Sequence, residues 1–354
     1  MKIVIKLSNL ILAIAVATMA GTATAHHSMT EFDRNVVEEA EGVVSRISWR
    51  NPHIMLEVTS TAENGVETIY HLEGNAESML RRRGVTAENL SVGDVVRVAG
   101  WPSTRRDNYL QVNHILLSDG IELLTAISME PRWTNNNLGT ARDVFDEDAV
   151  ASASGEGIFR VWSQAVPAWF FNNRSGWRLT DAAAAAVAQW DDIADNPIMQ
   201  CIPPGMPSMM GNPYPMEFRQ VGDNIEVAME EFDARRLIHM GENVADPEDV
   251  PLSLSGYSVG HWEGNTLVVD TSRLSQQYFN RAGAPQTPNA KINERFTVVE
   301  NGNRLNYVMT VDEPATLAEP FVWEAHFVWK PGEQVSIYGC ELEDWTTTEN
   351  TLTN

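Results

Sequence analysis

Three histidines in the N-terminal part of the chain could bind a metal ion. His26 and His27 directly follow Ala23-Thr-Ala25, a small-residue pattern typical of signal-peptide cleavage, and His53 follows Asn51-Pro52. Cleavage before His26 would put an amine and an imidazole on one residue, and with His27 or His53 these nitrogens could chelate divalent copper. Alternatively, the first two histidines are an unstructured start and His53 only orients the following strand. The ligand spacing typical of zinc sites is not found.

Polar and aromatic side chains in the C-terminal half could line a second kind of site. A binding site for a small molecule is usually an apolar cavity with a few convergent polar groups. The candidates are Tyr214, Arg219, Arg236, His239, Trp262, Trp323 and His326, together with Arg235 and Trp329. Alternatively, the tryptophans fill a core and the arginines form ion pairs on the surface.

One short motif resembles a catalytic one. Gly256-Tyr-Ser258-Val-Gly260 matches the nucleophile elbow of serine hydrolases, which requires a strand before the serine and a helix after it. The following segment, His261 to Asn265, instead predicts a hairpin turn. The nearby partners, His261, His239 and Asp270, do not follow the hydrolase order. The sequence therefore argues against a serine hydrolase at Ser258 and assigns no catalytic residue.

A group of methionines allows two interpretations. Met206, Met209, Met210 and Met216 lie close together in the sequence, shortly after Cys201. Thioethers bind Cu(I), so the group could transfer copper to or from the histidines. Methionine is also a flexible filler of apolar cores, and near a domain junction this second role is the favoured interpretation.

The composition bounds the class of protein and its compartment. The chain has 354 residues, 43% hydrophobic and 21% charged, which predicts a globular protein of two domains. Its formal charge of -23 would repel phosphate backbones, so nucleic acid is excluded as a bulk partner. Residues 1–25 resemble a cleaved signal peptide, because Lys2 and Lys6 precede an apolar run, Leu10 to Met19, that is short for a membrane span. We expect a periplasmic or secreted protein.

The expected compartment determines the expected redox state of the two cysteines. Cys201 and Cys340 are the only cysteines in the sequence. In an oxidising compartment they are expected to form a disulfide that closes a loop around the second half of the chain. The alternative is a pair of buried thiols.

Residues 26–120 predict a small β-barrel domain. Three β-rich runs come first, then a segment of helical propensity that Gly84 would end, and then two more β-rich runs. The predicted strands are Val36–Trp49, His53–Val58, Glu67–Glu73, Val92–Trp101 and Tyr109–Leu117, with Gly42 at a bend and a helix over Ala76–Arg83. This order is that of an OB-like barrel.

The same domain carries an ordered set of short motifs. They are His26-His-Ser, Phe32-Asp33, Asn51-Pro-His53, Leu80-Arg-Arg-Arg-Gly84, Leu90-Ser-Val-Gly-Asp94 and Val95-Val-Arg-Val-Ala-Gly100. In this set the chain resembles the exported bacterial family called domain of unknown function 6152. The second half, through Gly205-Met-Pro207 and Gly260-His-Trp-Glu-Gly264 among others, resembles the uncharacterised C-terminal part of many exported bacterial proteins. Neither resemblance implies a known activity.

The remaining sequence predicts a connector and a second barrel. The connector covers 121–200 and contains a helix over 180–190, which Thr180 would cap. Residues 201–345 show short strands separated by turn signals, which predicts an antiparallel, lipocalin-like barrel able to enclose one small ligand, and 346–354 form a tail. The alternation from Phe321 to Trp329 predicts one buried strand face. The sequence thus predicts a mainly β, exported protein that binds a small molecule or, alternatively, copper.

Overall fold

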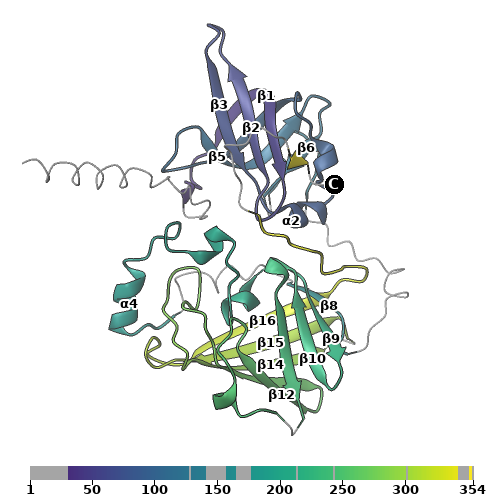
Figure 1. Cartoon of the computed structure of the whole chain (residues 1–354). Helices are drawn as coiled ribbons and strands as arrows, with labels where there is room; N and C mark the ends of the chain where they lie inside the picture. Colours follow the sequence, from purple (N-terminus) through teal and green to yellow (C-terminus); the bar gives the residue numbers. More distant parts are fainter. Residues whose placement is uncertain are drawn as a thin grey trace, which may run out of the picture.

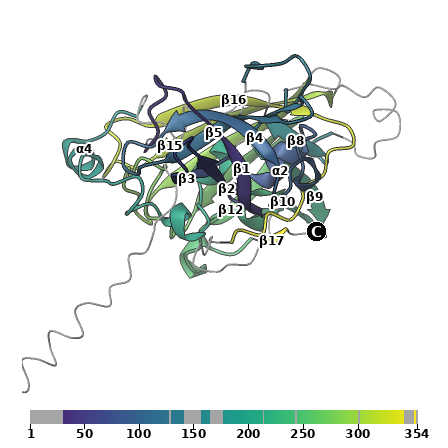
Figure 2. The ribbon, with the colours of Figure 1, turned by 90° about the horizontal axis from the view of Figure 1, so that it is seen from above.

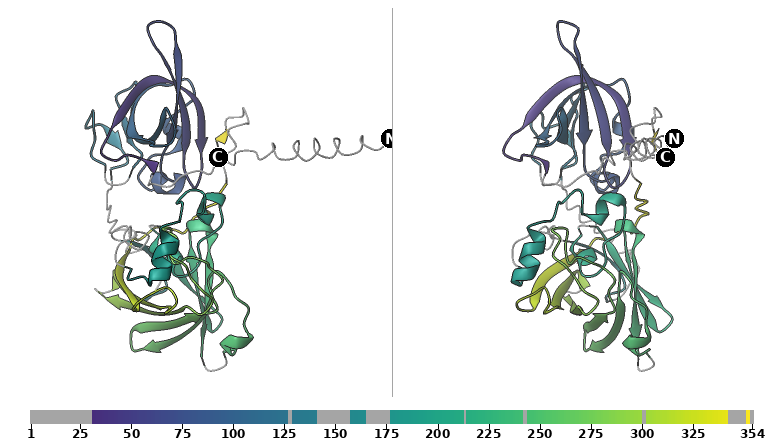
Figure 3. Two further views of the ribbon diagram at one scale, coloured as in Figure 1. Left: turned by 90° about the vertical axis from the view of Figure 1, so that its left-hand side faces the viewer. Right: turned by 60° about the vertical axis from the view of Figure 1, so that its left-hand side comes forward.

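The chain folds into two β-barrels stacked on one another (Figures 1 and 3). The computed structural model describes residues 31–126, 129–140, 157–164, 177–212, 214–241, 244–299, 302–341 and 351–352. Seen from above, the first barrel lies over the second (Figure 2). The predicted mainly β fold class is confirmed. No helix in the described ranges is long and apolar enough to cross a membrane.

Five strands form the first barrel and close in the order β1-β2-β3-β5-β4-β1, which is OB-like. Their bounds are β1 Glu38–Trp49, β2 Met55–Thr61, β3 Glu67–Glu73, β4 Val95–Pro102 and β5 Tyr109–Leu117. The predicted helix is the shorter α2 (Glu77–Arg81), and Gly84 after it has φ +78°. Two further strands, β6 (Glu122–Leu124) and β7 (Asn137–Leu138), continue this sheet past the predicted boundary at 120.

Gly42 in β1 has a different role from the one predicted. It pairs with Val96 in the regular ladder, and the irregularity in β1 falls between Val44 and Arg46 instead. A Cβ atom at Gly42 would lie 2.3 Å from the carbonyl oxygen of Thr59 in β2. The glycine is therefore required by the close approach of two backbones and not by a bend.

The second barrel closes in the order β10-β11-β12-β13-β14-β15-β16-β8-β9. Its strands are β8 Val161–Gln164, β9 Met216–Val221, β10 Asn224–Met229, β11 Arg235–Met240, β12 Tyr257–Glu263, β13 Thr266–Ser272, β14 Lys291–Val299, β15 Arg304–Asp312 and β16 Phe321–Trp329. Two features differ from the predicted antiparallel meander. Strand β8 comes from the predicted connector and closes the barrel between β16 and β9. Strands β11 and β12 are parallel, and the crossover connection that such a pair requires is the long segment between them, which contains the 3-10 helix η6 (Pro247–Asp249).

Alternating side chains fill the interior of the second barrel. Trp323 and Phe327 on β16 are 2% exposed and pack in its core, as the alternation predicts. Their neighbours include Tyr307 and Phe296, whose ring centroids lie 4.8 Å apart. The methionines Met206, Met209, Met210 and Met216 are all buried in this core, so the packing interpretation is confirmed.

The connector contains the predicted helix, which is α4 (Asp181–Val187). Thr180 caps it, because its side chain accepts a hydrogen bond of 3.3 Å from the backbone N–H of Ala183. The helix ends before the predicted residue 190, and it lies beside the second barrel (Figure 1). Shorter 3-10 turns are η2 Ala87–Asn89, η3 Pro197–Gln200, η4 Ser208–Gly211 and η5 Glu231–Asp233.

Residues 330–341, which we call the C-terminal strap, run from the second barrel to the first (Figure 1). The predicted disulfide between Cys201 and Cys340 is present and ties the strap to the end of η3. Val335 to Tyr338, in the middle of the strap, form no strand. Beyond the strap, β17 (Thr351–Leu352) pairs in parallel with β1.

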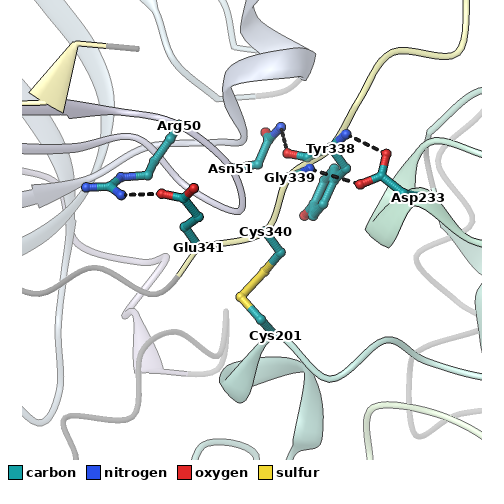
Figure 4. The surroundings of a disulfide bond; sticks show 8 residues. All are labelled: Arg50, Asn51, Cys201, Asp233, Tyr338, Gly339, Cys340 and Glu341. Carbon is teal, nitrogen blue, oxygen red and sulfur yellow. Dashed lines mark hydrogen bonds and ion pairs between the residues drawn. A yellow bond between two sulfur atoms is a disulfide. The ribbon is translucent and has the colours of Figure 1, made fainter.

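The strap makes hydrogen bonds to both barrels around the disulfide (Figure 4). On the second-barrel side, the carboxylate of Asp233 accepts the backbone N–H groups of Tyr338 at 3.0 Å and Gly339 at 3.1 Å. On the first-barrel side, the amide of Asn51 donates to the carbonyl oxygen of Tyr338 at 2.8 Å. The disulfide therefore holds in place a segment that both barrels contact.

Removing the disulfide is expected to destabilise the protein. The bond closes a loop of sequence separation 139, for which the chain-entropy relation gives about 4 to 5 kcal/mol of stabilisation. We expect the Cys201→Ser/Cys340→Ser variant to unfold at a clearly lower denaturant concentration than the wild type. Adding a reductant should lower the wild-type midpoint toward that of the variant and leave the variant unchanged. Equal midpoints for the wild type and the variant in the absence of reductant would contradict a stabilising role of the disulfide.

Candidate functional site

Five ionisable side chains meet at one end of the first barrel, and we call them the Glu73 cluster. Its members are Glu31, His53, Glu73, Arg106 and Tyr109. Glu73 is the last residue of β3 and Tyr109 the first of β5, and the register of this parallel pair, with His71 opposite Tyr109, places the end of β3 beside the start of β5. His53 precedes β2, which runs beside β3. The cluster therefore follows from the order of the barrel strands.

The contacts in the cluster are short and directional. Tyr109 donates its hydroxyl to Glu73 Oε2 at 3.2 Å, while His53 Nδ1 lies 3.3 Å from Glu73 Oε1 and 3.0 Å from the carbonyl oxygen of Gly74. Arg106 makes two parallel bonds to the Glu31 carboxylate, of 2.6 and 2.7 Å, with its guanidinium carbon 3.3 Å from the centre of the Tyr109 ring. Arg106 therefore pairs directly with Glu31, whereas Glu73 faces the neutral phenol and the imidazole.

Burial makes Glu73 titrate near neutrality. The residue is 2% exposed, and the loss of solvation raises the pKa of its carboxyl group from 4.5 to about 7, against the opposing influence of His53, Arg106 and Tyr109. Burial also raises the pKa of the Tyr109 hydroxyl well above its usual value. A carboxyl group with a pKa close to the ambient pH can accept or release a proton, which is a property of functional sites.

Of the three predicted copper ligands, one lies in the described part of the chain. His53 belongs to the Glu73 cluster, whereas His26 and His27 lie outside the described residues. Within the described ranges, no group of three or more histidine, cysteine, aspartate or glutamate side chains is arranged to hold a metal ion.

Two of the predicted ligand-binding residues, Arg236 and Trp323, lie inside the second barrel. Arg236 is 1% exposed and forms an ion pair with Glu294, which is 0% exposed. Its remaining N–H groups donate to the hydroxyls of Ser258 at 2.9 Å and Thr271 at 2.7 Å. Tyr307 donates to Glu294 at 2.8 Å. Arg236 thus takes part in a closed internal network.

Ser258 also belongs to this network. The serine is 0% exposed and is the second residue of β12, where its hydroxyl contacts Arg236 and, at 2.9 Å, Thr271. It does not stand on a strand–turn–helix elbow, which agrees with the sequence argument against a hydrolase.

The other five predicted ligand-binding residues are dispersed. Arg219 pairs with Glu217 on β9, and Trp262 is 45% exposed near the β12–β13 turn. Tyr214 packs edge-on against Tyr338 of the strap at 5.3 Å between ring centroids. His326 lies on β16 opposite Asn306, and His239 on β11 packs against Tyr257 at 4.8 Å. The seven residues do not form one site, but Tyr257, against which His239 packs, lines a groove.

This groove lies on the outer face of the second barrel and has a volume of about 400 Å³. We call it the outer groove. It is lined by Pro247, Tyr257, Val259, Asp270, Thr271, Ser272, Lys291, Ile292, Asn293, Thr310 and Asp312. Pro247 belongs to η6, in the segment between β11 and β12, and Tyr257 donates its hydroxyl to the carbonyl oxygen of Ala245 in that segment at 3.2 Å. The parallel crossover therefore builds the groove.

Sequence reasoning missed the outer groove. A signal was present, because Asp270, Asn293 and Thr310 are polar residues at outward-facing positions of three consecutive strands. Their register became known only from the strand pairing.

The fold and the cluster define the first domain as an OB-like barrel with an ionisable group of residues at one end. Residues 14–109 match the family model described as "Family of unknown function (DUF6152)", so the chain contains a DUF6152 domain, as its motifs predict. All five members of the Glu73 cluster lie within this match, and the rest of the chain is unassigned. Searches of curated proteins and of solved structures found no match.

The Glu73 carboxyl should make stability depend on pH. Its pKa rises from 4.5 to about 7 on folding, so the unfolded chain loses this proton first as the pH rises. The shifted pKa of Glu73 does not change the free energy of unfolding below about pH 4. Between about pH 4 and pH 7 it lowers the free energy of unfolding increasingly, by up to about 3 kcal/mol. We expect Glu73→Gln to gain stability relative to the wild type over this interval, in denaturant titrations at several pH values.

The matched control for this experiment is Glu41→Gln. The Glu41 side chain is 72% exposed on β1, so the stability of the Glu41→Gln variant should follow the wild-type curve at every pH. If the Glu73→Gln and wild-type curves ran parallel from pH 4 to pH 8, the raised pKa would be refuted.

Proposed function

We propose that this protein binds a small molecule in the outer groove. One observation supports the proposal most strongly: the groove has a volume of about 400 Å³, which is within the range of about 300 to 1,000 Å³ of known ligand sites. The interior of the barrel is an alternative location, but large side chains such as Phe218, Tyr307 and Trp323 pack there. The groove combines an apolar wall with a polar floor, which suits a small amphipathic ligand.

The proposal includes a compartment. The disulfide is consistent with an extracytoplasmic protein, since such bonds persist in oxidising surroundings. Together with the N-terminal segment, which has the pattern of a signal peptide, it supports export to the periplasm or the medium. The ligand would then be one that occurs outside the cytoplasm.

Blocking the groove is expected to abolish binding. Asn293 is a partly buried residue of its floor, so Asn293→Trp would fill the groove without changing the barrel interior. A library of small metabolites is screened by thermal shift, and compounds that stabilise the wild type should lose their effect on this variant. Val221→Trp is the control, because Val221 is 47% exposed at the end of β9 and does not line the groove. Hits that stabilise both variants equally would refute the groove as the site.

A second candidate function is copper binding at the N-terminus of the exported chain. Glu31 pairs with Arg106 in the Glu73 cluster, and His26 and His27 precede Glu31 in the sequence by five and four positions. The Nδ1 side of His53 faces Glu73 and Gly74, and such outer hydrogen bonds orient the rings of metal-binding histidines. Imidazole and amine nitrogens suit divalent copper.

Copper binding can be tested on the exported protein. We expect about one Cu(II) per chain by elemental analysis and an electron paramagnetic resonance spectrum with nitrogen ligands. His53→Ala and the His26→Ala/His27→Ala variant should each weaken Cu(II) binding at least tenfold. His261→Ala is the control, because that side chain is 56% exposed on β12 in the second barrel. Unchanged copper affinity in the His53→Ala variant would rule out this site.

A further inference from the structure

The floor of the outer groove consists of two rows of side chains across four strands. In the first row Val259 pairs with Asp270, Asp270 with Asn293, and Asn293 with Thr310. In the second row Tyr257 pairs with Ser272, and Lys291 pairs with Asp312. Each row therefore passes from an apolar or aromatic residue on β12 to hydrogen-bonding residues on β13, β14 and β15.

The charges of the groove restrict the ligand. Its lining includes the carboxylates of Asp270 and Asp312 and the ammonium group of Lys291, a formal sum of -2 + 1 = -1. Two carboxylates at the floor disfavour an anionic ligand, because like charges in a partly enclosed site repel. Lys291 is directly opposite Asp312, so these two charges largely compensate each other.

An organic cation is also disfavoured. Sites for such cations present the open face of an aromatic ring. Tyr257 is 6% exposed, and the ring of His239 packs against it with 4.8 Å between centroids. Lys291 adds a positive charge at the same floor. The groove therefore lacks both the aromatic surface and the uniform negative charge that an ammonium ligand would require.

The hydrogen-bonding groups suit hydroxyls. Asn293 donates its amide to Asp270 Oδ1 at 2.8 Å, which fixes the two side chains relative to each other. An ordered aspartate–asparagine pair presents acceptors and a donor side by side, and each hydroxyl of a polyol can both donate and accept. Thr310 continues the same row with one more hydroxyl. At the other end of the groove, Val259 and Pro247 offer an apolar surface for C–H groups.

We infer that the ligand of the outer groove is a neutral, polyhydroxylated ring, such as a monosaccharide or a cyclic polyol. One face of the ring would lie against Val259 and Pro247, and vicinal hydroxyls would bond to Asp270 and Asn293. This inference rests on the proposed function, since it assigns the ligand class of the same groove.

The test uses the full exported chain and isothermal titration with probes of three charge classes. The neutral probes are glucose, N-acetylglucosamine and myo-inositol, the cationic probe is spermidine, and the anionic probe is citrate. We expect at least one neutral probe to bind. Asp270→Ala and Asn293→Ala should each weaken that binding about tenfold, the equivalent of one lost hydrogen bond to a charged or amide partner.

Two further variants complete the design. Asp270→Asn keeps an acceptor but removes the charge, so it should weaken a neutral probe less than Asp270→Ala does. Asp223→Ala is the control, because Asp223 is exposed in the β9–β10 turn and does not line the groove. A neutral probe that binds equally well to Asp270→Ala and to the wild type would overturn the assignment of the groove to polyols.

The remaining outcomes separate the inference from the function it rests on. If spermidine or citrate binds in a manner that Asp270→Ala weakens, and no neutral probe does, the ligand class is wrong and the groove is still a binding site. If neither these probes nor the metabolite library show binding that Asn293→Trp removes, both the ligand class and the proposed function are wrong.

Discussion

The arrangement of the two barrels depends on the ion pairs of one arginine. Arg82, at the C-terminal end of α2 in the first barrel, contacts Glu230 of the second barrel and, at 3.1 Å, Glu333 of the strap. Glu230 is 0% exposed and also accepts the backbone N–H of Ser336 at 3.0 Å. Because a buried carboxylate without such partners would be costly, the strap, the first barrel and the second barrel stabilise one another at this point. The disulfide at Cys340 keeps the strap where these contacts can form.

The buried charges of the two barrels differ in how they are compensated. In the second barrel Glu294 faces Arg236 directly, and Tyr307 donates a further hydrogen bond to it, so both charges are paired inside an aromatic core. In the first barrel Arg106 makes its two short hydrogen bonds to Glu31, and Glu73 contacts the phenol of Tyr109 and the imidazole of His53. The ion pair between Arg236 and Glu294 explains why the network in the second barrel is structural. Burial is what raises the pKa of Glu73 to about 7, against the opposing influence of His53, Arg106 and Tyr109.

The local pattern predicted much of this fold, because burial alternates along single strands. The inner face of β16, the cap at Thr180 and the disulfide followed from residues near in sequence or from the count of cysteines. Two features depended on contacts between distant segments and could not be predicted in the same way. Short strand β8 carries too few residues for a periodic signal, and it is defined by its pairing with β16 and β9. The parallel pair of β11 and β12 depends on how the intervening segment crosses.

The candidate sites show the same division. His53 was predicted from its motif, but its partner Glu73 was not, because only the pairing of β3 with β5 brings Glu73 beside Tyr109. Of the predicted ligand-binding residues, Arg236 and Trp323 lie inside the second barrel, Arg236 in an ion pair with Glu294 and Trp323 in the aromatic core.

A closed barrel leaves two places for a ligand, its interior and its outer surface. In the second barrel the interior contains a paired arginine and glutamate surrounded by aromatic rings, so admitting a ligand there would break hydrogen bonds and close packing together. The outer surface of a strand pair is ordinarily too flat to enclose a small molecule. The parallel crossover changes this, because the segment between β11 and β12 contributes Pro247 to the lining of the groove beside residues of β12, β13, β14 and β15. The same connection that interrupts the antiparallel order thus provides the wall of the outer groove.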